Sequence, residues 1–366
     1  KSDTRNGPKV FGEGFDYALS YPFANPKAGE FTIPLNTFRL GTESLVANWI
    51  SIADADPSDG ESLRGQIDYY DQQGALLHSD TVDITNGGRR DFAGHDGLQR
   101  AGEQSVGLAR FRPALRDNGT VAPYYITTAR YFYDCPPQMP ICDDFRTAFS
   151  LPDRPATALP LNSSIATTDG VLSIVELNNI DTTIGQAQLA IRDASGDQLA
   201  NLTAEIPPLG TRHIFASRSG DLGFLATDSV GSAEVATIQG AVVPRTFFYK
   251  LNAQGQLEYA SVVPFSAPSG RQQFSQFNSF IAHDSAAELI NTSPVTQFVD
   301  VRVLSYDNRE HFRGQVELQA FASQLIPLVV PRDSFGSVVF EGTEASFVGQ
   351  VNVARAGMYS LHYRAE

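Results

Sequence analysis

Four carboxylates fall within eight residues in Asp54-Ala-Asp56-Pro-Ser-Asp59-Gly-Glu61. Carboxylate oxygens are the ligands that calcium prefers, so a calcium site formed by Asp54, Asp56, Asp59 and Glu61 is one hypothesis for this segment. The spacing departs from the twelve-residue EF-hand loop, because Pro57 interrupts it. A solvated acidic loop is therefore the favoured interpretation, and no other cofactor is expected.

A second polar cluster lies in the glycine-rich segment that runs from Gly87 to Gly97. An arginine can fork around a carboxylate and a histidine can respond to pH, so this segment is a candidate ligand loop. A later stretch, residues 210–221, holds the same residue types in a different order, which favours structural ion pairs instead. The candidate ligand residues are Arg89, Arg90, Asp91, His95 and Asp96.

Known catalytic motifs are absent from the sequence. The six histidines are scattered singly, without the paired spacing of a metalloprotease, and there is no nucleophile elbow, Walker loop or dinucleotide-binding glycine motif. We therefore expect a protein that is not an enzyme. A triad assembled from distant residues stays open, because such a site is recognised by geometry and not by sequence.

The two cysteines, Cys135 and Cys142, are separated by six residues, of which three are proline. This short, stiff segment predicts a local disulfide, which would place the chain outside the reducing cytosol; two buried thiols are the alternative. The start at Lys1 fits a trimmed mature protein. Four N-x-Ser/Thr sequons agree with secretion and are candidate glycosylation sites: Asn118, Asn162, Asn201 and Asn291.

The balance of 27 basic and 41 acidic residues gives a net charge of −14. This charge repels phosphate backbones and anionic lipid surfaces, so nucleic acid is excluded as a partner. No apolar run approaches the roughly 20 residues that a membrane helix needs, so no membrane span is expected.

The elements that must position these groups are strands. Every second residue is apolar in 187–191, 299–303 and 316–320, a pattern typical of half-buried strands, whereas helical periodicity is nearly absent. Each third of the chain has a strand that enters a turn beginning with an aspartate: Asp71, Asp193 and Asp307. Later in each third comes a strand with a glycine near its start: Gly107, Gly231 and Gly336. The sequence thus predicts an internal threefold repeat.

We therefore predict an all-β chain of three tandem antiparallel β-sandwich modules, covering residues 31–134, 156–266 and 267–366, with a disulfide-containing linker over residues 135–155. Over residues 31–366 the strand spacing and turns resemble those of secreted tandem immunoglobulin-like or fibronectin-like sandwiches. The Cys…Trp…Cys core of true immunoglobulin domains is missing.

Residues 1–30 read as an extended segment, too aromatic for a solvated tail and too rich in glycine and proline for a helix. Such a segment is expected to lie in a groove. The favoured position is across its own first module, and the alternative is addition to a sheet edge of a neighbouring subunit. The candidate contact residues are Phe11, Phe15, Tyr17, Tyr21 and Phe23.

These features together favour a non-enzymatic structural protein outside the cytoplasm, secreted or at the cell surface, which self-associates into a filament or sheath or contacts another surface protein. The alternative is an adhesin-like module that binds a protein or a glycan, the latter on aromatic pairs such as Tyr124-Tyr125, Tyr131-Phe-Tyr133 and Phe247-Phe-Tyr249. A secreted β-rich hydrolase is the third hypothesis.

Overall fold

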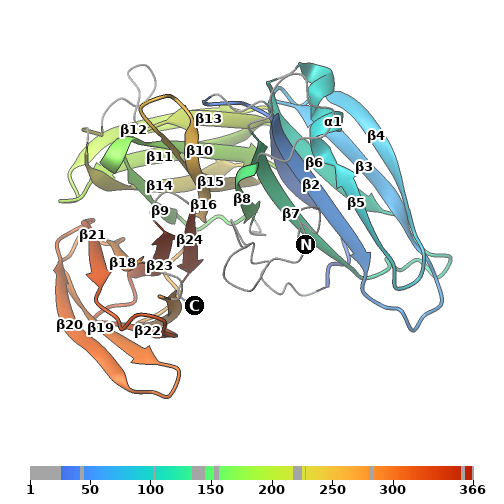
Figure 1. Cartoon of the computed structure of the whole chain (residues 1–366). Coiled ribbons are helices and arrows are strands. Elements are labelled where there is room, and N and C mark those ends of the chain that lie inside the picture. Colours follow the sequence, from blue (N-terminus) through green and yellow to red (C-terminus); the bar gives the residue numbers. More distant parts are fainter. Residues whose placement is uncertain are drawn as a thin grey trace.

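The chain is almost entirely β-structure in the computed structural model (Figure 1). The structure describes residues 26–41, 45–102, 104–133, 145–151, 156–216, 225–226, 228–279, 284–355 and 359–364. Within these residues, 24 strands form six four-stranded antiparallel sheets. The sheets pair into three sandwiches that follow one another in a bent array, which confirms the predicted tandem sandwiches.

The described part of the first sandwich includes the α-helix α1 (Gly94–Leu98) and the 3-10 turn η2 (Gln99–Ala101). Its strands are β1 (Phe31–Asn36), β2 (Leu45–Asp54), β3 (Leu63–Asp71), β4 (Leu76–Ile84), β5 (Arg89–Ala93), β6 (Val106–Pro113), β7 (Tyr124–Tyr133) and β8 (Phe145–Leu151).

The second sandwich has one 3-10 turn, η3 (Thr168–Gly170), among its described residues. Its strands are β9 (Leu161–Ala166), β10 (Val171–Asn179), β11 (Gly185–Asp193), β12 (Gln198–Ile206), β13 (Thr211–Phe215), β14 (Val230–Gln239), β15 (Val242–Leu251) and β16 (Leu257–Pro264).

The third sandwich is all strand in its described part. It consists of β17 (Gln272–Asn278), β18 (Asp284–Asn291), β19 (Gln297–Ser305), β20 (Glu310–Leu318), β21 (Ser323–Leu328), β22 (Phe335–Gly342), β23 (Phe347–Arg355) and β24 (Tyr359–Arg364).

All three sandwiches share one topology. In each, the first, sixth, third and fourth strands form one sheet in that order, and the fifth, second, seventh and eighth form the other: β1-β6-β3-β4 with β5-β2-β7-β8, β9-β14-β11-β12 with β13-β10-β15-β16, and β17-β22-β19-β20 with β21-β18-β23-β24. Three matching strand orders in succession make the internal repeat a property of the fold.

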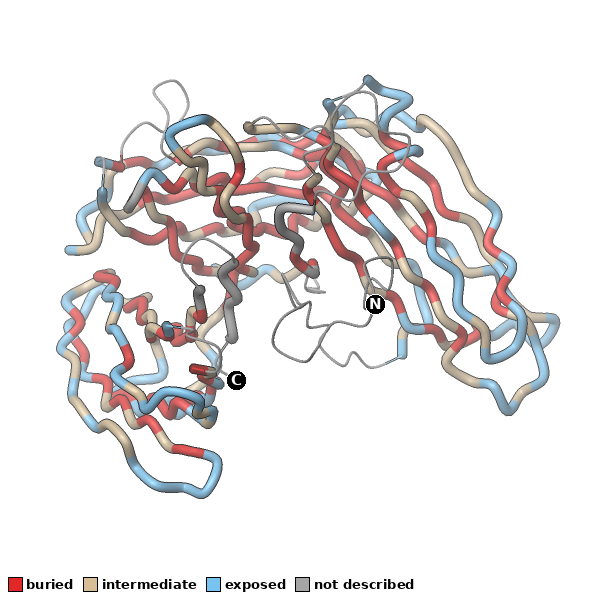
Figure 2. The backbone as a smooth tube through the Cα atoms, viewed as in Figure 1, coloured by how far each residue is buried: buried red, intermediate tan, exposed pale blue. Residues whose placement is uncertain are grey.

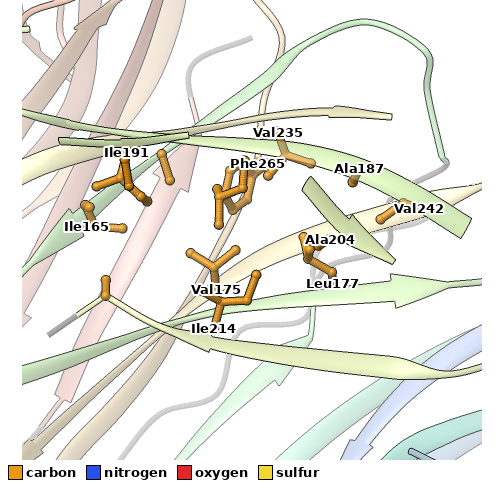
Figure 3. Close-up of a cluster of buried hydrophobic side chains, with 14 of the residues drawn as sticks. Ile165, Val175, Leu177, Ala187, Ile191, Ala204, Ile214, Val235, Val242 and Phe265 are labelled. Atoms are coloured by element: carbon orange, nitrogen blue, oxygen red, sulfur yellow. The ribbon is translucent and has the colours of Figure 1, made fainter. Parts of the chain in front are cut away.

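Alternation along the strands explains why each pair of sheets closes (Figure 2). In β11, Ala187, Leu189 and Ile191 are fully buried, and side chains of the facing sheet such as Val175 meet them in the centre of the second sandwich (Figure 3). Each sandwich has a hydrophobic cluster of its own. Apolar burial on the inner face of both sheets is therefore what holds each sandwich together.

In the third module, the residue that opens the repeated turn differs from the one predicted. Gly107 pairs with Asp71 and Gly231 with Asp193, but Gly336 pairs with Ser305, so Ser305 and not Asp307 opens the equivalent turn. A Cβ on each glycine would lie about 2 Å from a carbonyl oxygen of the neighbouring strand, at 2.1, 2.2 and 2.0 Å. This close approach of two backbones explains why all three strands have glycine there.

Strand β8 lies within residues 135–155, which the sequence analysis assigns to a linker. It pairs with β7 from Thr128 to Tyr133 and completes a sheet of the first sandwich. The sequence Phe-Arg-Thr-Ala-Phe-Ser-Leu does alternate, but the proline-rich residues before it dominate the composition of the segment. Among the described residues, no helix is long and apolar enough to cross a membrane.

Candidate functional site at the joints between sandwiches

The first joint connects sandwiches one and two through a hairpin turn and a loop. We call residues 71–75, between β3 and β4, a docking turn, and residues 207–211, between β12 and β13, a receiving loop. The N–H of Thr211 donates to the carbonyl oxygen of Gln72 at 3.1 Å. A Cβ on Gly74 would lie 1.8 Å from the carbonyl oxygen of Pro208, so only glycine allows this approach.

The second joint repeats these contacts between sandwiches two and three. Its docking turn is residues 193–197 and its receiving loop is residues 319–323. The N–H of Ser323 donates to the carbonyl oxygen of Ala194 at 3.1 Å, and a Cβ on Gly196 would lie 2.1 Å from the carbonyl oxygen of Ala320. The guanidinium of Arg192 also lies 4.1 Å above the Phe321 ring, a cation–π contact across the joint.

Local hydrogen bonds shape both docking turns. The Oδ1 atom of Asp71 accepts the N–H groups of Gln73 and Ala75, and the Oδ1 atom of Asp193 accepts those of Ser195 and Asp197. Gly74 and Gly196 close the turns with φ of 82° and 96°. The side chain of the first residue thus satisfies the turn backbone, and glycine adopts the left-handed conformation at the fourth position without strain.

The receiving loops are built alike as well. Leu209 and Phe321 hold the same left-handed position, at φ 52° and 59°, although neither is glycine. A buried asparagine fastens each loop: the Asn179 amide donates to the carbonyls of Thr183, Ile206 and Pro207, and the Asn291 amide to those of Val295, Leu318 and Gln319. The loop backbone is therefore held in shape before a turn docks on it.

An apolar interface also connects sandwiches one and two. Val46, Phe132, Phe149 and Leu151 of sandwich one form one buried cluster with residues of sandwich two, including Ile174, Phe247, Tyr249 and Leu257. Arg130 lies fully buried in this interface, with its guanidinium 4.7 Å from the Phe247 ring and 5.4 Å from the Phe149 ring. It also donates to Asn48 at 3.2 Å and to Tyr249 at 3.4 Å.

A buried acid–base pair lies on β10 and β13 beside this interface. Glu176, which is fully buried, accepts a hydrogen bond from Asn178 at 2.9 Å and lies 2.7 Å from Nε2 of His213. Burial raises the pKa of Glu176, but the contacts with His213, Arg130 and Asn178 outweigh burial and leave the pKa below its ordinary value. Glu176 is thus a stable anion within the interface.

The interface between sandwiches two and three contains a buried carboxyl group whose pKa is raised instead of lowered. Glu288 on β18 accepts hydrogen bonds from Gln350 at 2.5 Å and from Ser164 of sandwich two. Burial raises the pKa of Glu288 even though both hydrogen bonds lower it. This carboxyl group is therefore easier to bury as the neutral acid.

A cavity of about 550 Å³ opens between sandwiches one and two. Apolar side chains from β1, β6 and β15 form part of its wall, and its charged lining residues are Lys27, Arg110, Arg245 and Glu30. Glu30 is paired with Arg110. Three cations and one carboxylate give this cavity a positive lining in a chain of net charge −14.

The structure does not bring the four predicted calcium ligands together. Asp54 accepts the N–H groups of Asp56 and Gly87, and Asp56 accepts the N–H and the hydroxyl group of Ser58. Asp59 is paired with Arg116, which also lies 3.0 Å from Glu61. Among the described residues, no three His, Cys, Asp or Glu side chains are grouped as a metal site. Asp54 is the counterpart of Asn179 and Asn291 in the repeat, which gives it a structural role.

The candidate ligand loop is also dispersed. Arg89 bonds Asp91 at 3.0 Å and Ser51 at 2.9 Å on the exposed side of β5, whereas Arg90 lies over the Phe92 ring. His95 is buried in α1, with Nδ1 3.1 Å from the Asn48 carbonyl oxygen, and Asp96 is exposed 3.8 Å from its other nitrogen. The contacts of these five residues are therefore divided among separate partners.

Two of the four sequons are not available for glycosylation in this fold. Asn162 and Asn291 are buried, and the Asn291 amide already donates three hydrogen bonds. Asn118 and Asn201 are exposed.

The predicted aromatic runs contain both exposed and buried side chains: Tyr125 is exposed, while Tyr124, Phe247 and Tyr249 are buried. Sequons and aromatic runs do not specify which face of a strand a side chain occupies.

Two further predictions lie outside the described residues: the Cys135–Cys142 disulfide and the aromatic contacts of Phe11, Phe15, Tyr17, Tyr21 and Phe23. Sequence reasoning missed the buried charges Arg130, Glu176 and Glu288. Charged residues inside otherwise apolar strands are the signal that could have found them, because such residues are rarely buried without partners.

Comparisons with known proteins identify no family. No protein-family model matches the chain, and no curated protein does. Two solved structures of glycosyl hydrolase family 2 members from Bacteroides cellulosilyticus are each 9% identical, with TM-scores of 0.15 and 0.14. The matched regions cover 55% and 56% of this chain. They cover only 25% and 27% of the two solved chains, about a quarter of their length. Similarity this low carries no argument about activity.

Proposed function

We propose that the chain is a non-catalytic structural protein that works outside the cytoplasm, as a cell-surface element or as a subunit of a filament or sheath. The observation that carries the proposal is the recurrence of one joint. Two docking turns sit on two receiving loops with the same hydrogen bond at 3.1 Å, so successive sandwiches are held in direct contact.

Two buried interfaces support the same proposal. Arg130 is enclosed between aromatic rings at the first joint, and Glu288 bonds Ser164 across the second. A buried guanidinium and a buried carboxyl group both require fixed hydrogen-bond partners, so each interface favours a single relative orientation of its two sandwiches. A stiff array with its outer faces exposed suits a spacer or an assembling subunit better than a catalyst.

Electron microscopy and sedimentation velocity over a range of concentrations test the proposal. We expect a particle of constant bent shape that forms larger assemblies as concentration rises. If assembly uses the N-terminal segment, deletion of residues 1–25 leaves folded monomers. A chain that stays monomeric at every concentration and whose sandwiches reorient freely would contradict the structural role.

The cavity between sandwiches one and two favours a second candidate function, the binding of an anionic ligand. Its positive lining, with Lys27, Arg110 and Arg245, suits a carboxylate, and its apolar wall suits a sugar ring or an aliphatic body. Thermal melting with galacturonate oligomers, with neutral galactose oligomers as the control, tests this candidate. Binding predicts a rise in melting temperature with the acidic sugar alone; equal melting with both sugars contradicts it.

A further inference from the structure

A third turn in the chain has the construction of the two docking turns. It is residues 252–256, between β15 and β16. The Oδ1 atom of Asn252 accepts the N–H groups of Gln254 and Gln256, as the Oδ1 atoms of Asp71 and Asp193 do in their turns. Gly255 closes the turn at φ 77°, and its N–H donates to the carbonyl of Asn252 at 3.0 Å. Backbone path and side-chain cap are therefore shared by all three turns.

Among the described residues, none docks on this third turn. A Cβ on Gly255 would meet nothing within 4 Å, whereas one on Gly74 or Gly196 would meet a carbonyl oxygen of the next sandwich. Ala253 and Gln254 are exposed. Ala253 is the counterpart of Gln72 and Ala194, whose carbonyl oxygens accept the hydrogen bond at each joint.

One receiving loop contacts Pro57 of its own sandwich, but no turn of another sandwich is docked on it among the described residues; we call it the open loop. Residues 85–89 of sandwich one, between β4 and β5, correspond to loops 207–211 and 319–323. The N–H of Gly88 donates to the Thr85 carbonyl at 2.7 Å, as Gly210 and Ala322 do to the first residues of their loops. Gly87 holds the left-handed position, at φ 67°. Thr85, Asn86 and Arg89 are exposed, whereas the last two residues of each occupied loop are buried.

The bonding group of this open loop points outward. The N–H of Asp54 donates to the Gly88 carbonyl at 3.0 Å, as Asn179 does to Gly210 and Asn291 to Ala322. In an antiparallel ladder this register turns the N–H of the next residue away from the partner strand. Arg89 is that residue, and no described group accepts a hydrogen bond from its N–H. Thr211 and Ser323 use the same N–H to hold their docking turns.

The turn of the third sandwich cannot fill this loop. It is residues 305–309, and Asn308 stands at φ 63° where the docking turns have glycine. A side chain at this position would collide with the receiving backbone, as the 1.8 and 2.1 Å distances at the two joints indicate. The free glycine turn of a second copy is a better match.

We propose that turn 252–256 of one copy docks on loop 85–89 of a second copy, with the Arg89 N–H donating to the Ala253 carbonyl. The inference rests on the structural role proposed above and names one contact through which copies associate. The turn carries no charge, so it approaches the exposed Arg89 and Arg90 without repulsion. The contact is heterologous, so it extends into a filament or closes into a ring.

Sedimentation velocity from about 10 µM to 1 mM, a range suited to a small contact, tests the proposal with matched variants. Gly255→Asn adds a side chain in the manner of Asn308, and Gly119→Asn makes the same change in the turn at residues 116–120, which has φ 78° and no neighbour within 4 Å. Arg89→Pro removes the donor N–H, and Arg89→Ala keeps it.

We expect the association constant to fall about tenfold or more in Gly255→Asn and Arg89→Pro, a loss of about 1.4 kcal/mol or more, and to change less than twofold in both controls. Deletion of residues 1–25 leaves association through this contact intact. Association that all four substitutions leave unchanged overturns the docking contact and spares the structural role. A wild-type chain that is monomeric throughout overturns both.

Discussion

Gly74→Ala tests the first joint within a single chain. Alanine at φ 82° costs about 1–2 kcal/mol in its own backbone. Its Cβ would also lie 1.8 Å from the Pro208 carbonyl oxygen, whereas real Cβ atoms essentially never approach within 3.0 Å. The turn must therefore withdraw, which breaks the Thr211–Gln72 hydrogen bond and loosens the contact, at a cost of about 1–3 kcal/mol more.

Gly119→Ala is the matched control for this substitution. Gly119 also closes a turn in the left-handed conformation, at φ 78°, but a Cβ there meets nothing within 4 Å. We expect Gly119→Ala to lower the free energy of unfolding only by the backbone cost, about 1–2 kcal/mol. Urea denaturation followed by circular dichroism measures both variants, with each transition fitted separately because several domains need not unfold together. Equal losses in the two variants would refute the joint.

Three further predictions concern single side chains. Asn291→Asp removes the amide group that donates three hydrogen bonds and sets a carboxylate against the carbonyl acceptors, so we expect the free energy of unfolding in urea to fall by about 3 kcal/mol or more. Asp54→Asn, at the equivalent position of sandwich one, should lower it by less than about 1 kcal/mol. Because burial raises the pKa of Glu288, its contribution to stability is present at low pH and is lost as pH rises through that pKa; urea denaturation from pH 4 to 8 should show the wild type weakening relative to Glu288→Gln. The carboxylates of Asp54, Asp56, Asp59 and Glu61 are held by backbone donors and Arg116, so we expect EDTA to leave the melting temperature unchanged, and a lower one would restore the calcium hypothesis.

Strand alternation and turn composition were sufficient to predict the three sandwiches. Ala187, Leu189 and Ile191 follow a period of two that only a strand with one buried face explains, and Gly107, Gly231 and Gly336 mark the repeat because two backbones meet there. In the third sandwich, the sequence prediction placed the start of the turn at Asp307, because Asp307 resembles Asp71 in type. The strand register places it at Ser305 instead. Residue type alone cannot fix a register.

The joints could not be predicted from the sequence. Gly74 and Gly196 look like ordinary turn glycines, and Gly255 has the same local chemistry although a Cβ there meets nothing within 4 Å. What distinguishes the docked pair is the position of the next sandwich, which is a long-range property of the fold. In the clusters around Asp54 and Arg89, local turns and ion pairs engage several of the charged groups.

Amide hydrogen exchange at Thr211, Ser323 and Arg89, measured together by NMR on dilute protein, tests the repeated joint most directly. These amides occupy equivalent positions at the start of β13, β21 and β5, and they differ only in whether a turn is docked on them. We predict strong protection of the Thr211 and Ser323 amides and rapid exchange of the Arg89 amide. Exchange at Thr211 and Ser323 that is as fast as at Arg89 would contradict the joints.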